Sequence, residues 1–330
     1  MSRLRILFPA ILLSVLACQS QVPPEAPTET PTAALAATIP PTATPTLEPT
    51  PPPTPAPPAR RALILSIDGF RPDAIPLAPM PNLTALMQAS AYSLTAQTVY
   101  PSATLPAHTS MLSGQCPDKH GVDWNDYIPE NGYAPVTDLF DLAHAAGLQT
   151  VMYVGKEKLR QITEPESTDI FEYINDRDLV ITETLIQNFP ADFGLMFVHF
   201  PTADWMGHEY GWLSGEQLSV LFRADEAIAS LLAELDSRGM RDETLLIITA
   251  DHGGHGAAHG SSLPEDMTIP WIASGAGIQP AVLEAPITTV DTAATAAFAL
   301  GLPIPAEWDG VPVYEAFGLP VENVSVGCSK

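Results

Sequence analysis

The sequence predicts an α/β fold: a three-layer α/β/α sandwich around a mostly parallel sheet. Short apolar runs rich in β-branched residues, such as residues 62–67 and 244–250, are typical of strands buried on both faces. These runs alternate with helical patterns along the chain, and repeated β-then-α order favours parallel strands. No internal repeat and no second linker interrupts residues 61–330, so we expect a single domain there.

The expected elements follow one another through this domain. The strand patterns cover residues 62–67, 94–99, 149–154, 193–200, 244–250 and 268–273. The helical patterns cover residues 81–87, 136–146, 178–189, 214–235 and 290–300. Pro106 suits the first turn of one more helix, which places Thr104 at or just before the N-terminus of that helix.

Residues 1–18 resemble the signal peptide of a bacterial lipoprotein. Arg3 and Arg5 precede an apolar core at residues 6–16, which is too short for a comfortable membrane span. Val15-Leu16-Ala17-Cys18 is similar to a lipobox, so we expect Cys18 to carry lipid; the alternative is cleavage as an ordinary secretory signal. Lipidation predicts an extracytoplasmic protein, anchored to a bacterial membrane at the cell surface or in the periplasm.

Residues 19–60 form a segment rich in Pro, Thr and Ala, which cannot bury enough apolar surface to fold. Its proline density favours extended polyproline II, so we expect a semi-stiff stalk between the anchor and the folded domain at residues 61–330.

The balance of charge excludes one class of partner. The chain has 38 Asp and Glu against 14 Lys and Arg, a formal net charge of −24. Without a basic patch it cannot neutralise the phosphates of a nucleic-acid duplex, so we expect no duplex binding.

The cysteines beyond Cys18 are Cys116 and Cys328. In an oxidising compartment they form either a disulfide that ties the C-terminal tail to the domain or two free thiols, and the sequence leaves both open.

Potential metal ligands follow the ends of three expected strands. Asp251-His252-Gly253-Gly254-His255-Gly256-Ala257-Ala258-His259-Gly260 follows the strand at residues 244–250. Asp68 follows the first strand, and Asp204 and His208 follow the strand at residues 193–200, four positions apart on a helical turn. Ligands gather at this edge of open α/β sheets, and Asp with His suits zinc. Taken one at a time, these residues also fit ordinary turns and helix starts.

Together, these segments resemble the alkaline phosphatase superfamily, and most closely the type I phosphodiesterase/nucleotide pyrophosphatase family. The resemblance spans residues 61 to about 317. It is carried by Ile67-Asp68-Gly69, Pro101-Ser102-Ala103-Thr104-Leu105-Pro106-Ala107-His108, Gly121-Val122-Asp123-Trp124-Asn125, the segment from His199-Phe200 to His208, and Asp251-His252-Gly253.

The resemblance implies two zinc ions and a covalent mechanism. The ligands implied for one ion are Asp68, Thr104, Asp251 and His252. Those implied for the other are Asp204, His208 and a later histidine, for which His259 is the candidate and His255 the alternative. Thr104 would attack phosphorus and form a phospho-threonine, and Asn125 would donate a hydrogen bond to a phosphoryl oxygen.

The expected function is therefore hydrolysis of phosphodiester or pyrophosphate bonds in a small, nucleotide-like substrate. Leu105 stands where nucleotide-hydrolysing relatives commonly have Phe, which weakens the case for a nucleotide. The alternatives are a phosphomonoesterase, a phosphoethanolamine-type transferase, or a surface lipoprotein without catalysis. Lys156 either lines the substrate cleft or is a surface charge at a helix start, and we favour the surface charge.

Overall fold

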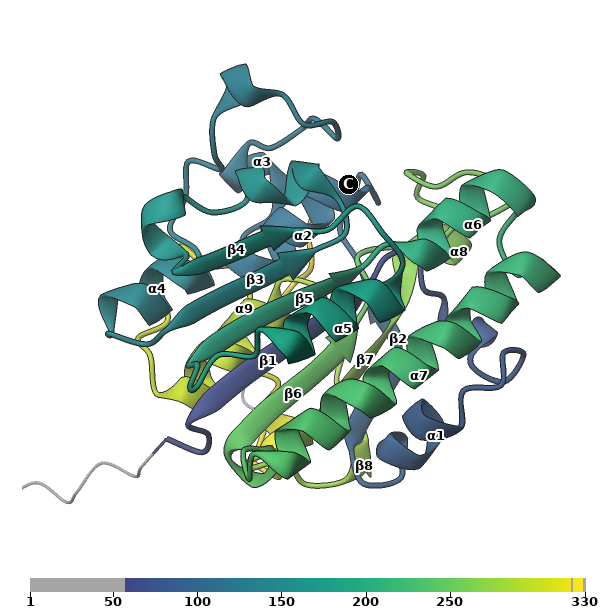
Figure 1. Cartoon of the computed structure of the whole chain (residues 1–330). Coiled ribbons are helices and arrows are strands. Elements are labelled where there is room, and N and C mark those ends of the chain that lie inside the picture. The colour runs from purple at the N-terminus through teal and green to yellow at the C-terminus, as the bar shows by residue number, and fades with distance from the viewer. Residues whose placement is uncertain (1–56, 322, 329–330) are drawn as a thin grey trace, which may run out of the picture. The chain divides into compact units, whose positions relative to one another are not determined.

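The computed structural model describes residues 57–321 and 323–328. Its described part contains a sheet with strand order β4-β3-β5-β1-β6-β7-β2-β8 (Figure 1). The strands are β1 (Arg61–Ile67), β2 (Ala91–Gln97), β3 (Thr150–Val154), β4 (Ile170–Tyr173), β5 (Leu195–Phe200), β6 (Thr244–Thr249), β7 (Thr268–Gly275) and β8 (Ala281–Val282).

Helices cover both faces of this sheet. They are α1 (Pro81–Met87), α2 (Thr104–Ser113), α3 (Pro117–His120), α4 (Leu139–Ala145), α5 (Asp178–Gln187), α6 (Thr202–Tyr210), α7 (Gly215–Ser237), α8 (Pro264–Met267) and α9 (Asp291–Leu300). Helices α1, α5 and α7 lie on one face, and α2, α4 and α9 on the other (Figure 1). The predicted three-layer α/β/α architecture is confirmed.

The prediction of a mostly parallel sheet is also confirmed. Strands β4, β3, β5, β1 and β6 are parallel neighbours. Strand β7 runs antiparallel to both β6 and β2. Strands β1, β5 and β6 are buried along their whole length, as expected for central strands covered by helices on both sides. Their carboxyl ends therefore meet at one edge of the sheet.

Some expected boundaries are wrong. The strand expected at residues 94–99 is β2, at Ala91–Gln97. The edge strands β4 and β8 were not predicted, because they are short and incompletely buried, which removes the apolar pattern that marks a strand. The C-terminal boundary expected for the stalk, residue 60, lies too late in the sequence. The Ala59 and Arg60 N–H groups already donate to the backbone carbonyl oxygens of Ala299 and Glu243 in the domain.

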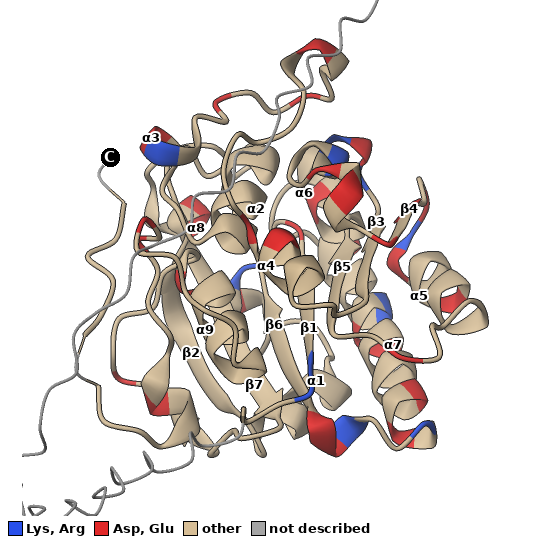
Figure 2. Cartoon of the chain, turned by 90° about the vertical axis from the view of Figure 1, so that its left-hand side faces the viewer, with Lys and Arg blue, Asp and Glu red and all other residues tan. Residues whose placement is uncertain are grey.

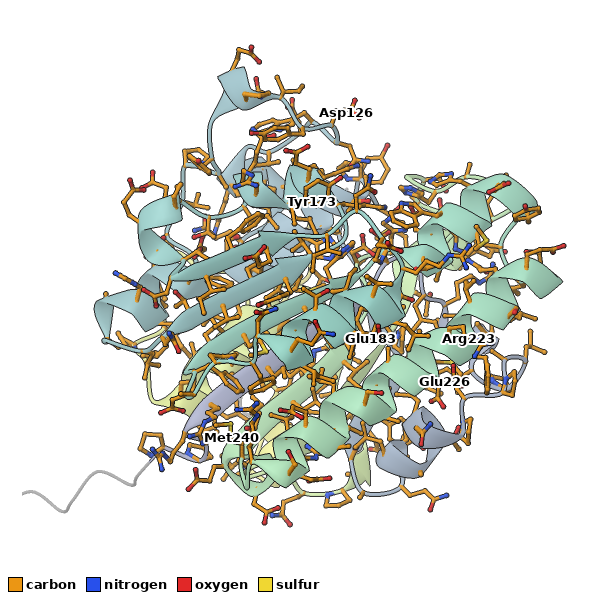
Figure 3. The ribbon with its side chains drawn as sticks, in the orientation of Figure 1. Asp126, Tyr173, Glu183, Arg223, Glu226 and Met240 are labelled. Carbon is orange, nitrogen blue, oxygen red and sulfur yellow. A yellow bond between two sulfur atoms is a disulfide. The ribbon has the colours of Figure 1, made fainter. Side chains whose placement is uncertain are left out.

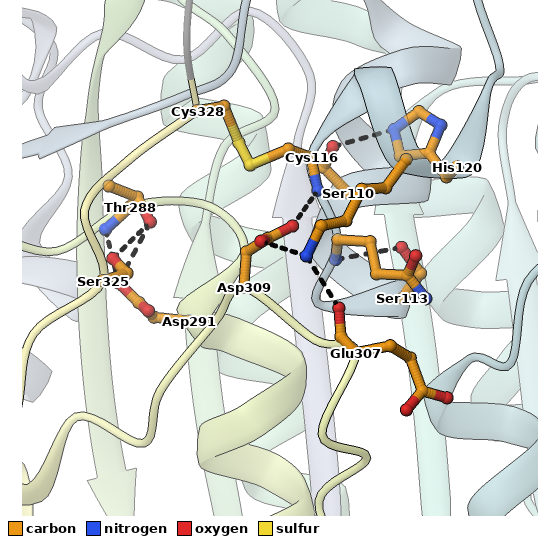
Figure 4. The surroundings of a disulfide bond; sticks show 12 residues. Ser110, Ser113, Cys116, His120, Thr288, Asp291, Glu307, Asp309, Ser325 and Cys328 are labelled. Atoms are coloured by element: carbon orange, nitrogen blue, oxygen red, sulfur yellow. Dashed lines mark hydrogen bonds and ion pairs between the residues drawn. A yellow bond between two sulfur atoms is a disulfide. The ribbon is translucent and has the colours of Figure 1, made fainter.

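A disulfide between Cys116 and Cys328 ties the C-terminal tail to the segment after α2 (Figure 4). Asp309 accepts hydrogen bonds beside it from the Cys116 N–H and from the Lys119 ammonium. In the same tail, before Cys328, the Ser325 hydroxyl donates a hydrogen bond to the Asp291 carboxylate at the start of α9. Of the two possibilities left open by the sequence, the structure has the disulfide.

The predicted signal peptide and most of the predicted stalk lie outside the described residues. Across residues 57–321 and 323–328, none of the helices combines the length and apolar composition that a membrane crossing requires. Figure 2 shows Asp and Glu positions distributed over several helices and loops of the domain, in keeping with the acidic composition.

Candidate metal centre

The candidate ligands come from three neighbouring strands. Asp68 follows β1, Asp251 follows β6, and Asp204 lies in the first turn of α6, which begins just after β5. Strand β1 pairs with both β5 and β6, so segments far apart in the sequence end side by side. The sheet order thus places three buried carboxylates at one edge.

Asp68, Asp251 and His252 form the first group, with one ligand atom from each within 4.8 Å of the others. The Nε2 atom of His252 lies 3.4 Å from Asp68 Oδ1 and 3.3 Å from Asp251 Oδ2. All three of these atoms are buried and have no hydrogen-bond partner among the described residues. Buried polar atoms are rarely left in this state, so three that converge indicate a site for a bound cation.

Asp204, His252 and His259 form the second group. Asp204 Oδ1 lies 3.6 Å from Nε2 of His259 and 3.4 Å from Nε2 of His208, one helical turn further along α6. It too lacks a hydrogen-bond donor within the described structure. Because one imidazole nitrogen binds one ion, and Nε2 of His252 lies nearer to Asp68 and Asp251, we assign His252 to the first group.

The three histidines present the same nitrogen to the centre. Nδ1 of His252, His259 and His208 lies within hydrogen-bond distance of the carbonyl oxygens of Gly253, Ser102 and Ala257, respectively. An Nδ1–H that donates to a carbonyl fixes the tautomer and leaves the Nε2 lone pair free, which is the usual arrangement of metal-binding histidines. Burial lowers the pKa of His252, and burial with the neighbouring His252 lowers the pKa of His259 to about 4, so both are neutral near pH 7.

The carboxylates are also held in place. Oδ1 of Asp251 accepts hydrogen bonds from the N–H groups of Gly69 and His252, which turns Oδ2 toward the first group. Gly69 has φ +71°, and a Cβ there would lie 3.2 Å from the Cα of Asp204. Glycine therefore allows the turn after β1 to pass close to α6.

His199 holds Asp68 from the other side. Its Nδ1 accepts from the Gly155 N–H at 3.2 Å, which requires the proton on Nε2, and Nε2–H donates to Asp68 Oδ2 at 2.9 Å. Oδ1 of Asp68 is thereby left for a cation. His199 belongs to a segment that carries the family resemblance, but the sequence alone suggests no role for it. Its place on β5, facing Asp68 across the β1–β5 pair, shows that it orients Asp68.

Thr104 begins α2 and its side chain is buried. The prediction that it lies at a helix N-terminus is confirmed. Asn125 follows in the adjacent loop, and its amide oxygen accepts from the Leu105 N–H at 2.9 Å. This bond leaves the NH₂ end of the Asn125 amide available to a ligand.

Lys156 is a component of the site, and its interpretation as a surface charge is wrong. Its ammonium lies 2.7 Å from Asp68 Oδ2 and 2.6 Å from Asp204 Oδ2, and donates to Thr104 Oγ1 at 3.2 Å. Lys156 thus bridges the Oδ2 atoms of Asp68 and Asp204, whereas the Oδ1 atoms of both carboxylates have no hydrogen-bond partner among the described residues. Nothing in the local sequence distinguishes Lys156 from an exposed lysine, because the turn after β3 brings it inward.

The charges of this cluster are strongly interdependent. Burial raises the pKa of Asp68, but Lys156 and His199 together hold it well below its usual range. Burial and the charge of Asp68 raise the pKa of Asp204, which Lys156 brings down to about 2. Burial and then Asp68 raise the pKa of Asp251 well above its usual range. A divalent cation between Asp68 and Asp251 would supply the positive charge that their joint ionisation requires.

The residues present therefore fit two divalent cations. Buried carboxylate oxygens and imidazole nitrogens, unpartnered and held by hydrogen bonds from behind, form two adjacent groups beside a threonine hydroxyl. His255 belongs to neither group, because its Nδ1 pairs with Asp266 at 2.7 Å. The structure thus places His259 at the second group and His255 outside it.

A cleft of about 430 Å³ is lined by Thr104 and by Asp204, His208 and His259 of the second group. The aromatic residues Tyr127 and Trp205 line it. Tyr153 is buried within β3, and Tyr210 lies on the exposed end of α6. Leu105 is fully buried, so the residue after Thr104 contacts the core and not a substrate.

Comparison with known proteins agrees with this geometry. A family model described as type I phosphodiesterase/nucleotide pyrophosphatase matches residues 62–141 and 154–260, more than half of the chain. The chain belongs to this family. All the candidate ligands of this phosphodiesterase family member lie within the matched residues.

Individual relatives of this family member are distant. The bis(5'-adenosyl)-triphosphatase enpp4 of Mus musculus is 25% identical over 217 residues, which are 59% of this chain and 47% of the relative. Venom phosphodiesterase 2 of Crotalus adamanteus is 26% identical over 219 residues, 58% of this chain and 26% of the relative. The chain therefore spans less than half the length of these relatives.

A solved structure shows the same fold. Murine ectonucleotide pyrophosphatase/phosphodiesterase 5, an inactive variant in complex with AMP, superposes with a TM-score of 0.68 at 15% identity. The match covers 79% of this chain and 99% of that one. This likeness supports the alkaline-phosphatase-like architecture of the family member described here.

Proposed function

We propose that this protein hydrolyses phosphodiester or pyrophosphate bonds with two zinc ions and a covalent phospho-threonine intermediate. The observation that carries the proposal is the convergence of unpartnered Asp68 Oδ1, Asp251 Oδ2, His252 Nε2 and Asp204 Oδ1 beside the cleft that Thr104 lines. The mixed carboxylate and imidazole set favours zinc. When bound, two zinc ions would supply Lewis-acid stabilisation of the attacking and leaving oxygens.

The protein's own groups have distinct tasks in this reaction. Thr104 Oγ1 attacks phosphorus and loses its proton, the bond from phosphorus to the leaving oxygen breaks, and the leaving oxygen takes up a proton from solvent in exchange. Water then attacks the phospho-threonine, releases the phosphorylated product and returns a proton to Thr104. The Asn125 NH₂ donates to a non-bridging phosphoryl oxygen, and the Thr104 N–H at the start of α2 donates to the same anion.

The substrate we propose is a small phosphodiester or a nucleotide-like pyrophosphate. The AMP bound by the murine relative supports a nucleotide-like ligand, and Tyr127 and Trp205 offer aromatic surface in the cleft. Leu105 gives no such surface, since it is buried.

We also propose that the protein is lipid-anchored through Cys18 outside the cytoplasmic membrane. The Cys116–Cys328 disulfide supports an oxidising compartment. Mass spectrometry of the mature N-terminus tests the anchor: a diacylated Cys18 is expected, and an unmodified N-terminus would reject it. Cys18→Ala should release the protein from the membrane fraction.

The decisive experiment compares zinc-loaded variants on a chromogenic phosphodiester and on the matching monoester. Thr104→Ala should lose roughly 10³-fold or more in kcat/KM, because the nucleophile is removed. His255→Ala, outside both groups, is the control and should stay near the wild-type rate. Monoester turnover ten times faster than diester turnover would reject the diesterase, and equal rates for wild type and Thr104→Ala would reject catalysis altogether.

A further inference from the structure

We propose that Lys158 binds a second phosphoryl group next to the attacked phosphorus, so that the enzyme prefers a pyrophosphate bond to a plain phosphodiester. The inference rests on the proposed function, which it makes more specific. It assigns the preference to one side chain in the cleft over the metal groups.

The first argument is the charge of the centre. Two divalent cations bound at the two groups would carry four positive charges, against three negative charges on Asp68, Asp204 and Asp251. Lys156, which contacts Asp68 and Asp204, adds one positive charge, so the loaded centre would have a surplus of two positive charges. A plain phosphodiester brings one negative charge. A pyrophosphate diester brings two, one of them on the neighbouring phosphoryl group.

The second argument is the environment of Lys158. It lines the same cleft as Thr104 and is half-buried. Burial, and next the charge of Lys156, lower the pKa of Lys158. Within residues 57–321 and 323–328, no carboxylate lies within ion-pair distance of its ammonium, although Asp68, Asp204 and Asp126 are near enough to attract it. A lysine that is partly desolvated without a close counter-ion gains most from an anionic ligand.

Neutral donors also line the cleft. Tyr173, at the carboxyl end of β4 (Figure 3), and Asn175 line it, and neither side chain makes a hydrogen bond within the described part of the chain. The cleft is not uniformly positive, because Glu157 also lines it. The geometry therefore favours one local anion subsite at Lys158 over a general attraction for negative charge.

The test compares dimethyl phosphate, which carries one negative charge, with P1,P2-dimethyl diphosphate, which carries two. Binding is measured by calorimetry on zinc-loaded Thr104→Ala protein, so that neither ligand is consumed, and zinc content is measured on each variant. Lys158→Gln is added to this background, with Lys158→Arg as the charge-conserving variant. Arg223→Gln on α7 removes an equal charge from an exposed helix away from the cleft and is the matched control (Figure 3).

We expect Lys158→Gln to reduce the preference for the diphosphate by roughly tenfold or more, the loss typical of one charge-assisted hydrogen bond. Lys158→Arg should restore most of the preference, and Arg223→Gln should leave it unchanged. The same ratio, taken from kcat/KM on hydrolysable esters with Thr104 intact, should fall in parallel. An unchanged preference in Lys158→Gln, or an equal fall in Arg223→Gln, would overturn the proposal.

The two proposals fail in different ways. Thr104-dependent hydrolysis of both esters without discrimination by Lys158 would leave the proposed function standing and reject the subsite. Binding of the diphosphate that depends on Lys158, in a protein that hydrolyses neither ester, would support the subsite and reject the proposed reaction.

Discussion

Replacing both Cys116 and Cys328 by serine should lower the free energy of unfolding by about 3 to 5 kcal/mol. The disulfide joins residues 212 positions apart. In the chain-entropy model, closing a loop of that length lowers the conformational entropy of the unfolded chain and so raises its free energy by about 5 kcal/mol. This is the upper value, and it applies if the tail stays in place when the bond is absent.

The lower value follows from the position of the bond near the chain end. If residues after Gly318 left the surface, the bond would close only a loop of about ten residues in the folded state. The difference between the two loop closures is about 3 kcal/mol. The bond from Ser325 to Asp291 holds the tail independently (Figure 4), so we expect a result toward the upper value.

The assay is equilibrium urea unfolding followed by tryptophan fluorescence, with Trp271 fully buried in β7. Wild-type protein treated with a reductant is the control, because it loses the same bond without a substitution. A loss below about 1 kcal/mol in both samples would refute the reasoning, since even the lower estimate exceeds it. Agreement between the double variant and the reduced wild type excludes an effect of serine itself.

Three further predictions concern the site and the helix caps. His259→Ala should lower the zinc content by one of two equivalents whereas His255→Ala should not, as measured by elemental analysis; equal losses would remove His259 from the second group. His199→Gln should weaken zinc binding roughly 10- to 100-fold in competition with a chromophoric chelator, because Asp68 loses its orienting partner, and an unchanged affinity would show that Lys156 suffices. Burial and Asp141 raise the pKa of Asp138, the N-cap of α4, to about 8. The folded state then holds a proton that the unfolded state releases, so stability should fall between about pH 4 and pH 8, by at most roughly 1.4 kcal/mol per pH unit. Asp138→Asn should remove that slope in denaturation curves, and parallel curves for both proteins would contradict it.

The sequence predicted the elements that carry strong patterns. Strands β1, β5 and β6 are mostly apolar runs, and the residues after them were recognised because Asp68 and Asp251 follow two of these runs directly and Asp204 follows the third within four residues. The order of strands in the sheet, which brings Asp68, Asp204 and Asp251 together, was not predicted; the family resemblance implied only that these residues share a site. Strand β7 is antiparallel, and β-then-α order alone does not show this.

Features that depend on tertiary contact were missed. Lys156 sits in a segment that reads as a charged helix start, and its contacts with Asp68 and Asp204 arise from the turn after β3. The orienting role of His199 depends on the register between β1 and β5, which places Ser66 opposite His199. Such registers are set by packing across the sheet and leave no signature within one segment.

The origin of the ligands on β1, α6 and the loop after β6 has a consequence for biosynthesis. The first ligand, Asp68, precedes the last, His259, by 191 positions, about seven-tenths of the length of the domain. A growing chain that has made β1 but not β6 can present no complete cation site, so it cannot capture zinc tightly as a nascent fragment. Tight zinc uptake would thus report that the central strands have already assembled.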